Sequence, residues 1–109
     1  MAKYGNRKVY YNGIPFDSIR ERDRYIELTL LQRAGEISDL RTQVKFELLP
    51  SQRYDGKVVE RPVTYIADFV YKDKLGNTVV EDAKGCRTKE YILKRKMMLY
   101  FLGIRVREV

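Results

Sequence analysis

The sequence predicts one α/β domain, spanning residues 1–109, in which a mixed β-sheet is flanked by helices. The predicted order is helix, three strands, helix, strand. Three observations favour this fold class. A chain of 109 residues has the length of one domain. Two segments carry helix start and stop signals. Runs of alternating or β-branched residues indicate strands between and after them, and such interspersed elements pack as a sheet against helices.

The N-terminal part is expected to hold a loose basic arm, a short strand with a turn, and the first helix. The arm covers residues 1–9, and the strand and turn cover residues 10–14. Ser18 and Glu21 match the S-x-x-E capping box at a helix start, and Gly35 ends the helix. One stripe of this helix is expected to face the core, and it comprises Ile19, Ile26, Leu30 and Ala34. Tyr25, Leu28 and Leu31 lie off that stripe, which leaves open a second side of the helix in contact with protein.

Three strands are predicted in the middle of the chain. Residues 42–49 alternate with period two until Pro50, and residues 51–57 are expected to form a polar loop with an Asp-Gly turn. Residues 63–71 are the strongest strand candidate. Gly76 and Asn77 then indicate a hairpin turn, and the β-branched residues 78–80 open a returning strand over residues 78–83.

The C-terminal part is predicted to form a helix over residues 88–102 and a last strand over residues 104–109. Thr88 suits the N-cap of the helix, and Gly103 suits its C-cap.

The composition excludes several classes of chemistry. The chain has no His, which removes Ser-His-Asp and Cys-His triads, His-ligated zinc and a histidine general base. It has a single Cys, which favours a reducing, cytoplasmic setting, and no segment predicts a signal peptide or a membrane span. Any catalysis must therefore use carboxylates, lysine, tyrosine or a metal held by oxygen ligands.

The net charge of +7 is concentrated near the C-terminus. Residues 84–109 hold eight Lys or Arg against two acids, whereas the first 83 residues hold 14 against 13. Clustered cations of this kind favour binding to a polyanion such as DNA. The alternative is a solvated helix that is merely basic. The candidate phosphate-binding residues lie at and after the start of the second helix, and they are Arg87, Thr88, Lys89, Lys94 and Arg95.

Two acids of the predicted hairpin are expected to face each other. If the turn is centred near Leu75, Asp68 falls opposite Asp82, with Cβ atoms about 5 Å apart. Carboxylates at that separation repel unless a cation bridges them, and oxygen ligands suit Mg²⁺ or Mn²⁺. Lys84, two residues beyond Asp82, would point into the same site. The alternative is that both acids are exposed and paired with nearby lysines.

The pattern Asp68, thirteen intervening residues, then Asp82-Ala83-Lys84 resembles the D…(D/E)-x-K signature of the PD-(D/E)XK nuclease superfamily, with Ala67 in place of the proline. Further stretches from residue 10 to residue 109 are similar to small phage-encoded members. The resemblance implies a restriction-endonuclease-like core. It also implies that Asp68, Asp82 and the Ala83 carbonyl bind the metal and that Lys84 is the catalytic lysine. Glu21 matches an acid that the first helix contributes in many members, although the capping box accounts for this residue equally well.

The resemblance implies a Mg²⁺- or Mn²⁺-dependent endodeoxyribonuclease, and the Holliday-junction resolvases, which act in DNA recombination, are the closest functional model. Paired cuts in a branched junction would require a homodimer, and a phage-encoded enzyme would work in the cytoplasm of a bacterial host. No organic cofactor and no membrane partner are expected. Two alternatives stay open: a non-catalytic nucleic-acid-binding module, and a nuclease that acts on linear or single-stranded DNA.

Overall fold

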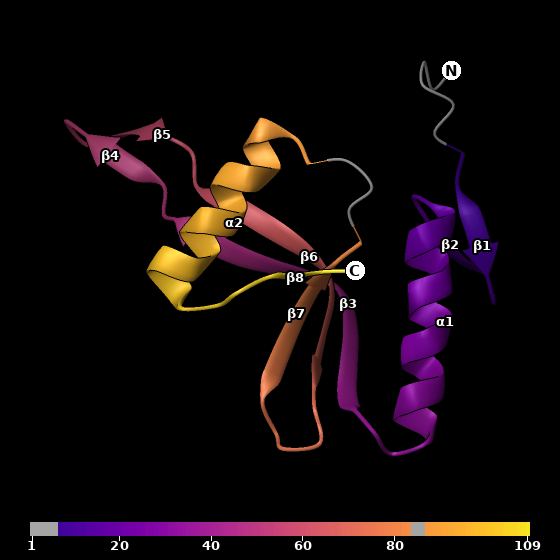
Figure 1. The fold of residues 1–109 in the computed structure, drawn as a ribbon. Coiled ribbons are helices and arrows are strands. Elements are labelled where there is room, and N and C mark those ends of the chain that lie inside the picture. The colour runs from indigo at the N-terminus through magenta and orange to yellow at the C-terminus, as the bar shows by residue number, and fades with distance from the viewer. Residues whose placement is uncertain (1–6, 84–86) are drawn as a thin grey trace.

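A four-stranded mixed sheet and two helices form the centre of the molecule. The computed structural model describes residues 7–83 and 87–109. The elements of this core are α1 (Ile19–Arg33), β3 (Ser38–Leu49), β6 (Val63–Lys72), β7 (Thr78–Asp82), α2 (Lys89–Leu102) and β8 (Arg107–Glu108). The strand order is β3-β6-β7-β8, in which only β7 and β8 run parallel (Figure 1). The predicted class, an α/β fold with a mixed sheet flanked by helices, is confirmed.

Two small hairpins are added to this core. The first joins β1 (Val9–Tyr11) to β2 (Ile14–Phe16), so the predicted short strand and turn is confirmed as a hairpin. Its turn residues Asn12 and Gly13 both have positive φ, 50° and 78°, as a tight two-residue hairpin turn requires. Of the predicted basic arm, residues 1–6 lie outside the described residues, and Val9 already belongs to β1.

The second hairpin lies where a polar loop was predicted over residues 51–57, so that prediction is wrong. Strands β4 (Gln52–Tyr54) and β5 (Lys57–Glu60) pair there across an Asp55–Gly56 turn, whose φ values are 52° and 75°. The turn was recognised in the sequence, but its flanking residues pair as strands because the two-residue turn brings them into register. This hairpin projects from the body of the molecule, and every residue in it is exposed (Figure 1).

The helix ends follow the sequence signals. The Ser18 side chain accepts a hydrogen bond from the Glu21 N–H at 3.1 Å, and the Thr88 side chain accepts one from the Tyr91 N–H at 3.1 Å. Gly103 ends α2 with a φ of 67°, in the left-handed region that glycine tolerates. The two outer strands differ in length from the prediction: β3 begins at residue 38 instead of 42, and only residues 107–108 pair in β8.

The predicted core stripe of α1 is wrong. Ile19 is 60% exposed and Leu30 is 54% exposed, whereas Leu28 is fully buried. The inward face instead carries Glu21 and Tyr25, at helical spacing from Leu28. Tyr25 and Leu28 belong to the second contact side that the sequence left open, whereas a count of apolar residues misses the charged side chains of this face, which bind polar partners in the sheet.

Near the middle of β6, buried residues two positions apart pack against different helices. Tyr65 and Ala67 pack in a cluster with residues of α2, whereas Phe69 packs in a second cluster with Leu28 of α1. A regular strand would keep residues two apart on one face. On the neighbouring strand, Gln43 has a φ of 52°, a left-handed conformation that is rare inside a strand. This irregular point of the sheet lies between the two helices.

Neither helix in the described part of the chain is long and apolar enough to span a membrane.

Candidate active site

The β6–β7 hairpin has the predicted register. Phe69 pairs with Glu81 and Val70 with Val80, so the same register places Asp68 opposite Asp82. The Asp68 Oδ2 atom accepts a hydrogen bond from the N–H of Ala83 at 2.8 Å. These two acids therefore lie side by side at the end of β7.

Asp82 is almost fully buried, with 1% of its surface exposed. The Tyr65 hydroxyl donates a hydrogen bond to its Oδ2 atom at 2.5 Å. Burial and this contact with the Asp82 carboxylate raise the pKa of Tyr65 well above its ordinary value, so the phenol keeps its proton. The hydroxyl holds one side of the carboxylate in place.

A single amide connects the first helix to the hairpin acids. The Gln43 Nε2 group donates to Glu21 Oε2 at 3.0 Å and to Asp68 Oδ1 at 3.3 Å. Glu21 is 6% exposed. Its backbone N–H binds the capping Ser18, while its carboxylate points to Gln43. The cap bond uses only the backbone N–H of Glu21, which any residue supplies, whereas its carboxylate contacts Gln43 in the acidic cluster.

The crowded carboxyls disfavour their own ionisation. Burial, followed by repulsion from Asp68, raises the pKa of Glu21 to about 7. Burial also raises the pKa of Asp68 to about 6, against the opposing effect of the Ala83 N–H, and the charge of Asp82 adds to the increase. Carboxyl groups thus crowd at one partly buried point, and a bound cation would relieve the repulsion between their ionised forms.

The donor set fits a hard divalent cation. Within residues 7–83 and 87–109, no three Asp, Glu or Cys side chains converge into a ready-made metal site. The carboxylates of Asp68 and Asp82 are nevertheless adjacent, and oxygen donors of this kind are those that Mg²⁺ and Mn²⁺ prefer. Asp68 and Asp82 would hold such an ion, with the Ala83 carbonyl and Glu21 as further oxygen donors.

The position of the predicted catalytic lysine is not part of this geometry. Lys84 lies outside the described residues, and Ala83 is the last described residue before it. Its predicted role stays a prediction.

Glu81, which precedes Asp82 on β7, has a structural role. It is completely buried, and Arg24 of α1 binds it with two hydrogen bonds, at 2.9 and 2.7 Å. The Tyr71 hydroxyl also donates to it. Because Arg24 and Glu21 are three residues apart on α1, this clamp holds the same helix face that delivers Glu21 to the site.

The predicted phosphate-binding residues of α2 are mostly engaged within the protein. Arg87 and Arg95 both bind the Glu108 carboxylate, at 2.6 and 3.0 Å. The hydrogen bond from the Tyr91 hydroxyl, followed by those from Arg87 and Arg95, lowers the pKa of Glu108. Lys94 pairs with Glu90 at 3.2 Å. The exposed Lys89 follows the capping Thr88 at the helix start. The structure thus brings Arg87 and Arg95 together, but on an acid that the sequence did not connect with them.

The comparisons with known proteins identify the family but no function. A family model described as Protein of unknown function (DUF1064) matches residues 1–107. The chain belongs to this family. No curated protein and no solved structure matches it.

In this DUF1064 member, Gln43 is the site residue that sequence reasoning missed. It lies in a stretch of alternating residues, where its side chain looks like one more exposed polar group. Only the pairing of β3 with β6 reveals its position, because Thr42 pairs with Phe69 and Val44 with Ala67, which leaves Gln43 opposite Asp68. No local signal in the sequence could have supplied that register.

Proposed function

We propose that this protein is a Mg²⁺- or Mn²⁺-dependent endonuclease that hydrolyses phosphodiester bonds in branched DNA, with Holliday junctions as the preferred substrate. The observation that carries the proposal is the pair Asp68 and Asp82 on adjacent antiparallel strands, joined through Gln43 to Glu21. The spacing Asp82-Ala83-Lys84 and its resemblance to nuclease signatures support the same conclusion.

Each site residue has a distinct task in this mechanism. Asp68 and Asp82 would hold the divalent ion, which when bound would supply activation of water and neutralisation of charge on the scissile phosphate. Lys84 stabilises the negative charge that develops on the phosphate. Glu21, whose pKa is raised to about 7 by burial and by Asp68, can take up or release a proton near neutral pH. Gln43 orients Glu21 and Asp68 relative to each other.

Two further features belong to the proposal. Symmetric cuts across a junction need two active sites in a fixed relation, which a homodimer supplies. A DNA substrate places the activity in the cytoplasm, within the bacterial host cell if the protein is encoded by a phage.

Cleavage of three labelled DNAs tests the function: a four-way junction, a linear duplex and a single strand, each with Mg²⁺ or EDTA. We expect paired cuts in the junction, with Mg²⁺ only. Cleavage confined to linear or single-stranded DNA would replace the resolvase with a nuclease of another specificity. Binding of all three DNAs without cleavage in Mg²⁺ or Mn²⁺ would indicate a non-catalytic module.

Two substitutions test the site. Asp68→Asn and Lys84→Ala should each lower the cleavage rate at least about a hundredfold, while binding to the junction changes little. The matched controls are Asp55→Asn, in the exposed β4–β5 turn, and Lys45→Ala, on an exposed strand position. Both controls should cleave at the wild-type rate. Wild-type cleavage by either site variant would show that the active site lies elsewhere.

A further inference from the structure

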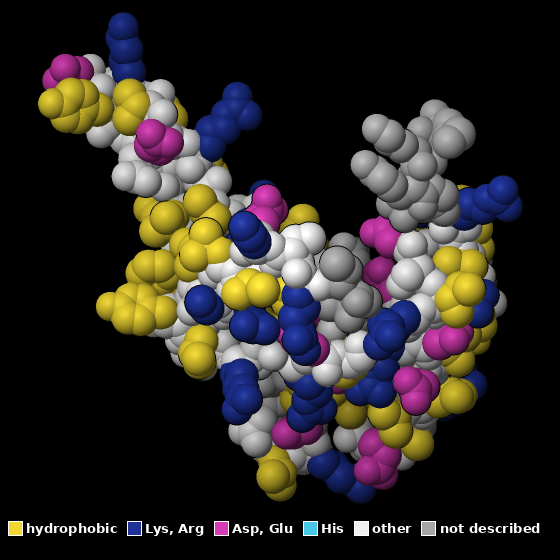
Figure 2. Space-filling view, turned by 45° about the horizontal axis from the view of Figure 1, so that its top comes forward, with side chains coloured by type: hydrophobic (Ala, Val, Ile, Leu, Met, Phe, Trp, Pro, Cys, Tyr) yellow, Lys and Arg dark blue, Asp and Glu magenta, His cyan; other side chains and the backbone are white. Residues whose placement is uncertain are grey.

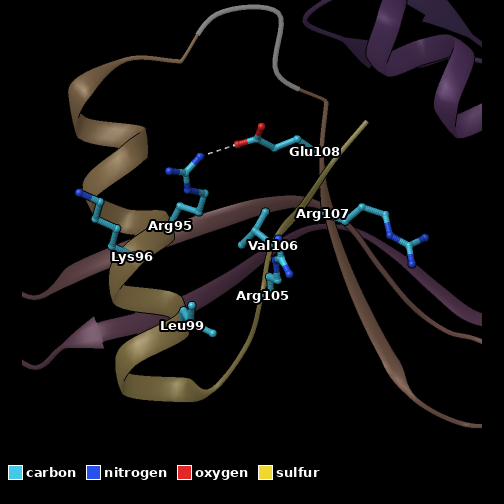
Figure 3. A pocket seen from close by; sticks show the side chains of 7 residues that line it. All are labelled: Arg95, Lys96, Leu99, Arg105, Val106, Arg107 and Glu108. Carbon is cyan, nitrogen blue, oxygen red and sulfur yellow. Dashed lines mark hydrogen bonds and ion pairs between the residues drawn. The ribbon is translucent and has the colours of Figure 1, made fainter.

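A positively charged groove separates α2 from the C-terminal segment. Its volume is about 790 Å³. Figure 3 shows the groove residues, with Arg95 directed across it toward Glu108 and Arg107 extending away from α2. The complete lining is Arg95, Lys96, Leu99, Arg105, Val106, Arg107 and Glu108. Four of these seven residues are cations and one is an acid.

Among the residues that the structure describes, two of the four groove cations share their acidic partner with another arginine, and the other two have no ion pair. Glu108 is shared by Arg95 and Arg87. Arg107 lies 3.8 Å from Glu81, but Arg24 already binds that carboxylate with two hydrogen bonds. Lys96 and Arg105 make no ion pair with any of the residues that the structure describes. The groove therefore offers cations to an external anion.

The groove also has an apolar part. Val106 is 6% exposed and belongs to the core cluster beneath α2, and Leu99 borders it from the helix. A polymer of alternating sugars and phosphates matches this combination, since sugars pack on apolar side chains and phosphates bind Arg and Lys. Figure 2 shows Lys and Arg side chains gathered across the middle of the view, between the projecting β4–β5 hairpin and α1.

The groove lies next to the candidate active site. Its wall includes β8, which pairs in parallel with β7: Arg107 is the partner of Glu81, and Glu108 is the partner of Asp82. The Val109 N–H also donates to the Asp82 carbonyl at 3.1 Å. Paired strands lie about 4.8 Å apart, so a polyanion bound along β8 would pass about one strand spacing from Asp82 on β7.

We propose that this groove binds the sugar–phosphate backbone of DNA beside the cleavage point, with Lys96 and Arg105 as phosphate contacts. The inference rests on the proposed nuclease function and specifies where its substrate binds. It assigns the main phosphate contacts to Lys96 and Arg105 of the groove, in place of Arg87 and Arg95, which are paired with Glu108.

Fluorescence anisotropy with a labelled duplex and a labelled junction, in EDTA so that no DNA is cut, tests the proposal. The variants are Lys96→Ala, Arg105→Ala and the double substitution, whose side chains are exposed. Removing one phosphate contact should lower the slope of log K against log salt by about 0.9, which weakens binding about eightfold at 0.1 M salt. The double variant should lose roughly 60-fold, from the same relation.

The matched control is Lys45→Ala. Val44 and Phe46 pack against the α2 cluster, so Lys45 between them points to the opposite face of the sheet. This variant should bind DNA with the wild-type affinity and salt slope. Circular dichroism melts of all variants ensure that a change in binding does not reflect unfolding.

Four outcomes separate this proposal from the proposed function. Weaker binding by both groove variants, with cleavage by the wild type in Mg²⁺, supports both. The same weaker binding without any cleavage supports the groove and overturns the nuclease. Wild-type affinity and salt slope in both groove variants overturn the groove, whether or not the wild type cleaves. Displacement of the duplex by a deoxymononucleotide at the same phosphate concentration would show a site for free nucleotides and would also overturn it.

Discussion

Replacing Glu21 with Gln tests whether the carboxyls at the irregular point of the sheet repel one another. The pKa of Glu21 is raised from 4.5 to about 7, first by burial and then by the charge of Asp68. Between these pH values the folded chain keeps a proton that the unfolded chain has lost. The free energy of unfolding should therefore fall as the pH rises from about 4.5 to about 7, in the absence of metal.

The structure sets the size of this effect. Without solvent screening, the difference between the pKa of Glu21 in the unfolded and the folded chain would lower the free energy of unfolding by about 3 kcal/mol. A pocket of about 220 Å³, lined by Glu21, Gln43 and Lys8 among others, opens beside the carboxyl. Because water in this pocket screens the charge, we expect about 1.5 kcal/mol. The amide in Glu21→Gln keeps the shape of the side chain and never ionises, so the variant should lack this loss.

Urea denaturation followed by circular dichroism, in EDTA and at pH values from 4.5 to 8.5, measures the difference. At pH 8 Glu21→Gln should be more stable than the wild type by about 1.5 kcal/mol, and at pH 4.5 the two should be nearly equal. Asp68, whose pKa is raised to about 6 mainly by burial, should leave a smaller decline in both proteins. The control Glu60→Gln alters an exposed acid of the β4–β5 hairpin and should follow the wild type. Equal pH dependence in Glu21→Gln and the wild type would refute the reasoning.

Three other predictions address the metal, the clamp and the strained glutamine. At pH 8, Mg²⁺ at 100 times its Kd should stabilise the wild type by about 2.7 kcal/mol in urea denaturation, and Asp68→Asn should abolish this gain. Arg24→Met leaves the buried Glu81 without its bidentate partner and should cost about 3 kcal/mol in the same assay. The double variant Arg24→Met/Glu81→Met should recover most of that loss; no recovery would contradict a buried-charge effect. Because Gln43 has a φ of 52°, Gln43→Gly should be about 1 kcal/mol more stable than Gln43→Ala, although both should cleave DNA poorly. Equal stability of these two variants would show that the backbone there is not strained.

Local signals account for what could be predicted. The caps at Ser18 and Thr88 are set by hydrogen bonds within one helical turn, so three or four residues are enough to recognise them. The β6–β7 register follows from a single tight turn, which is why the sequence placed Asp68 opposite Asp82. These short-range constraints yielded the fold class and the two hairpin acids.

Contacts between distant segments account for what was missed. Gln43 reaches Asp68 only because β3 pairs with β6, 25 residues later. Glu108 binds Arg87 and Arg95, which precede it by 21 and 13 residues. A count of charges in this segment does not reveal these ion pairs. The polar part of the inward face of α1 escaped recognition because Arg24 is charged and its partner, Glu81, lies 57 residues later. Partners of this kind are decided by tertiary packing, not by periodicity.

The alternation of β7 gives its two terminal acids separate tasks. Glu81 points to α1, where Arg24 fixes the helix against the sheet, and Asp82 points to the other side, where Tyr65 holds it. Because Arg24 and Glu21 lie on one face of α1, the Glu81 clamp sets how far Glu21 stands from Asp68. Disturbing the clamp should therefore shift the pKa of Glu21 toward its ordinary value, even though Arg24 does not touch Glu21. Arg24→Met should for that reason weaken the fall in stability between pH 4.5 and 7 as well as lowering stability throughout.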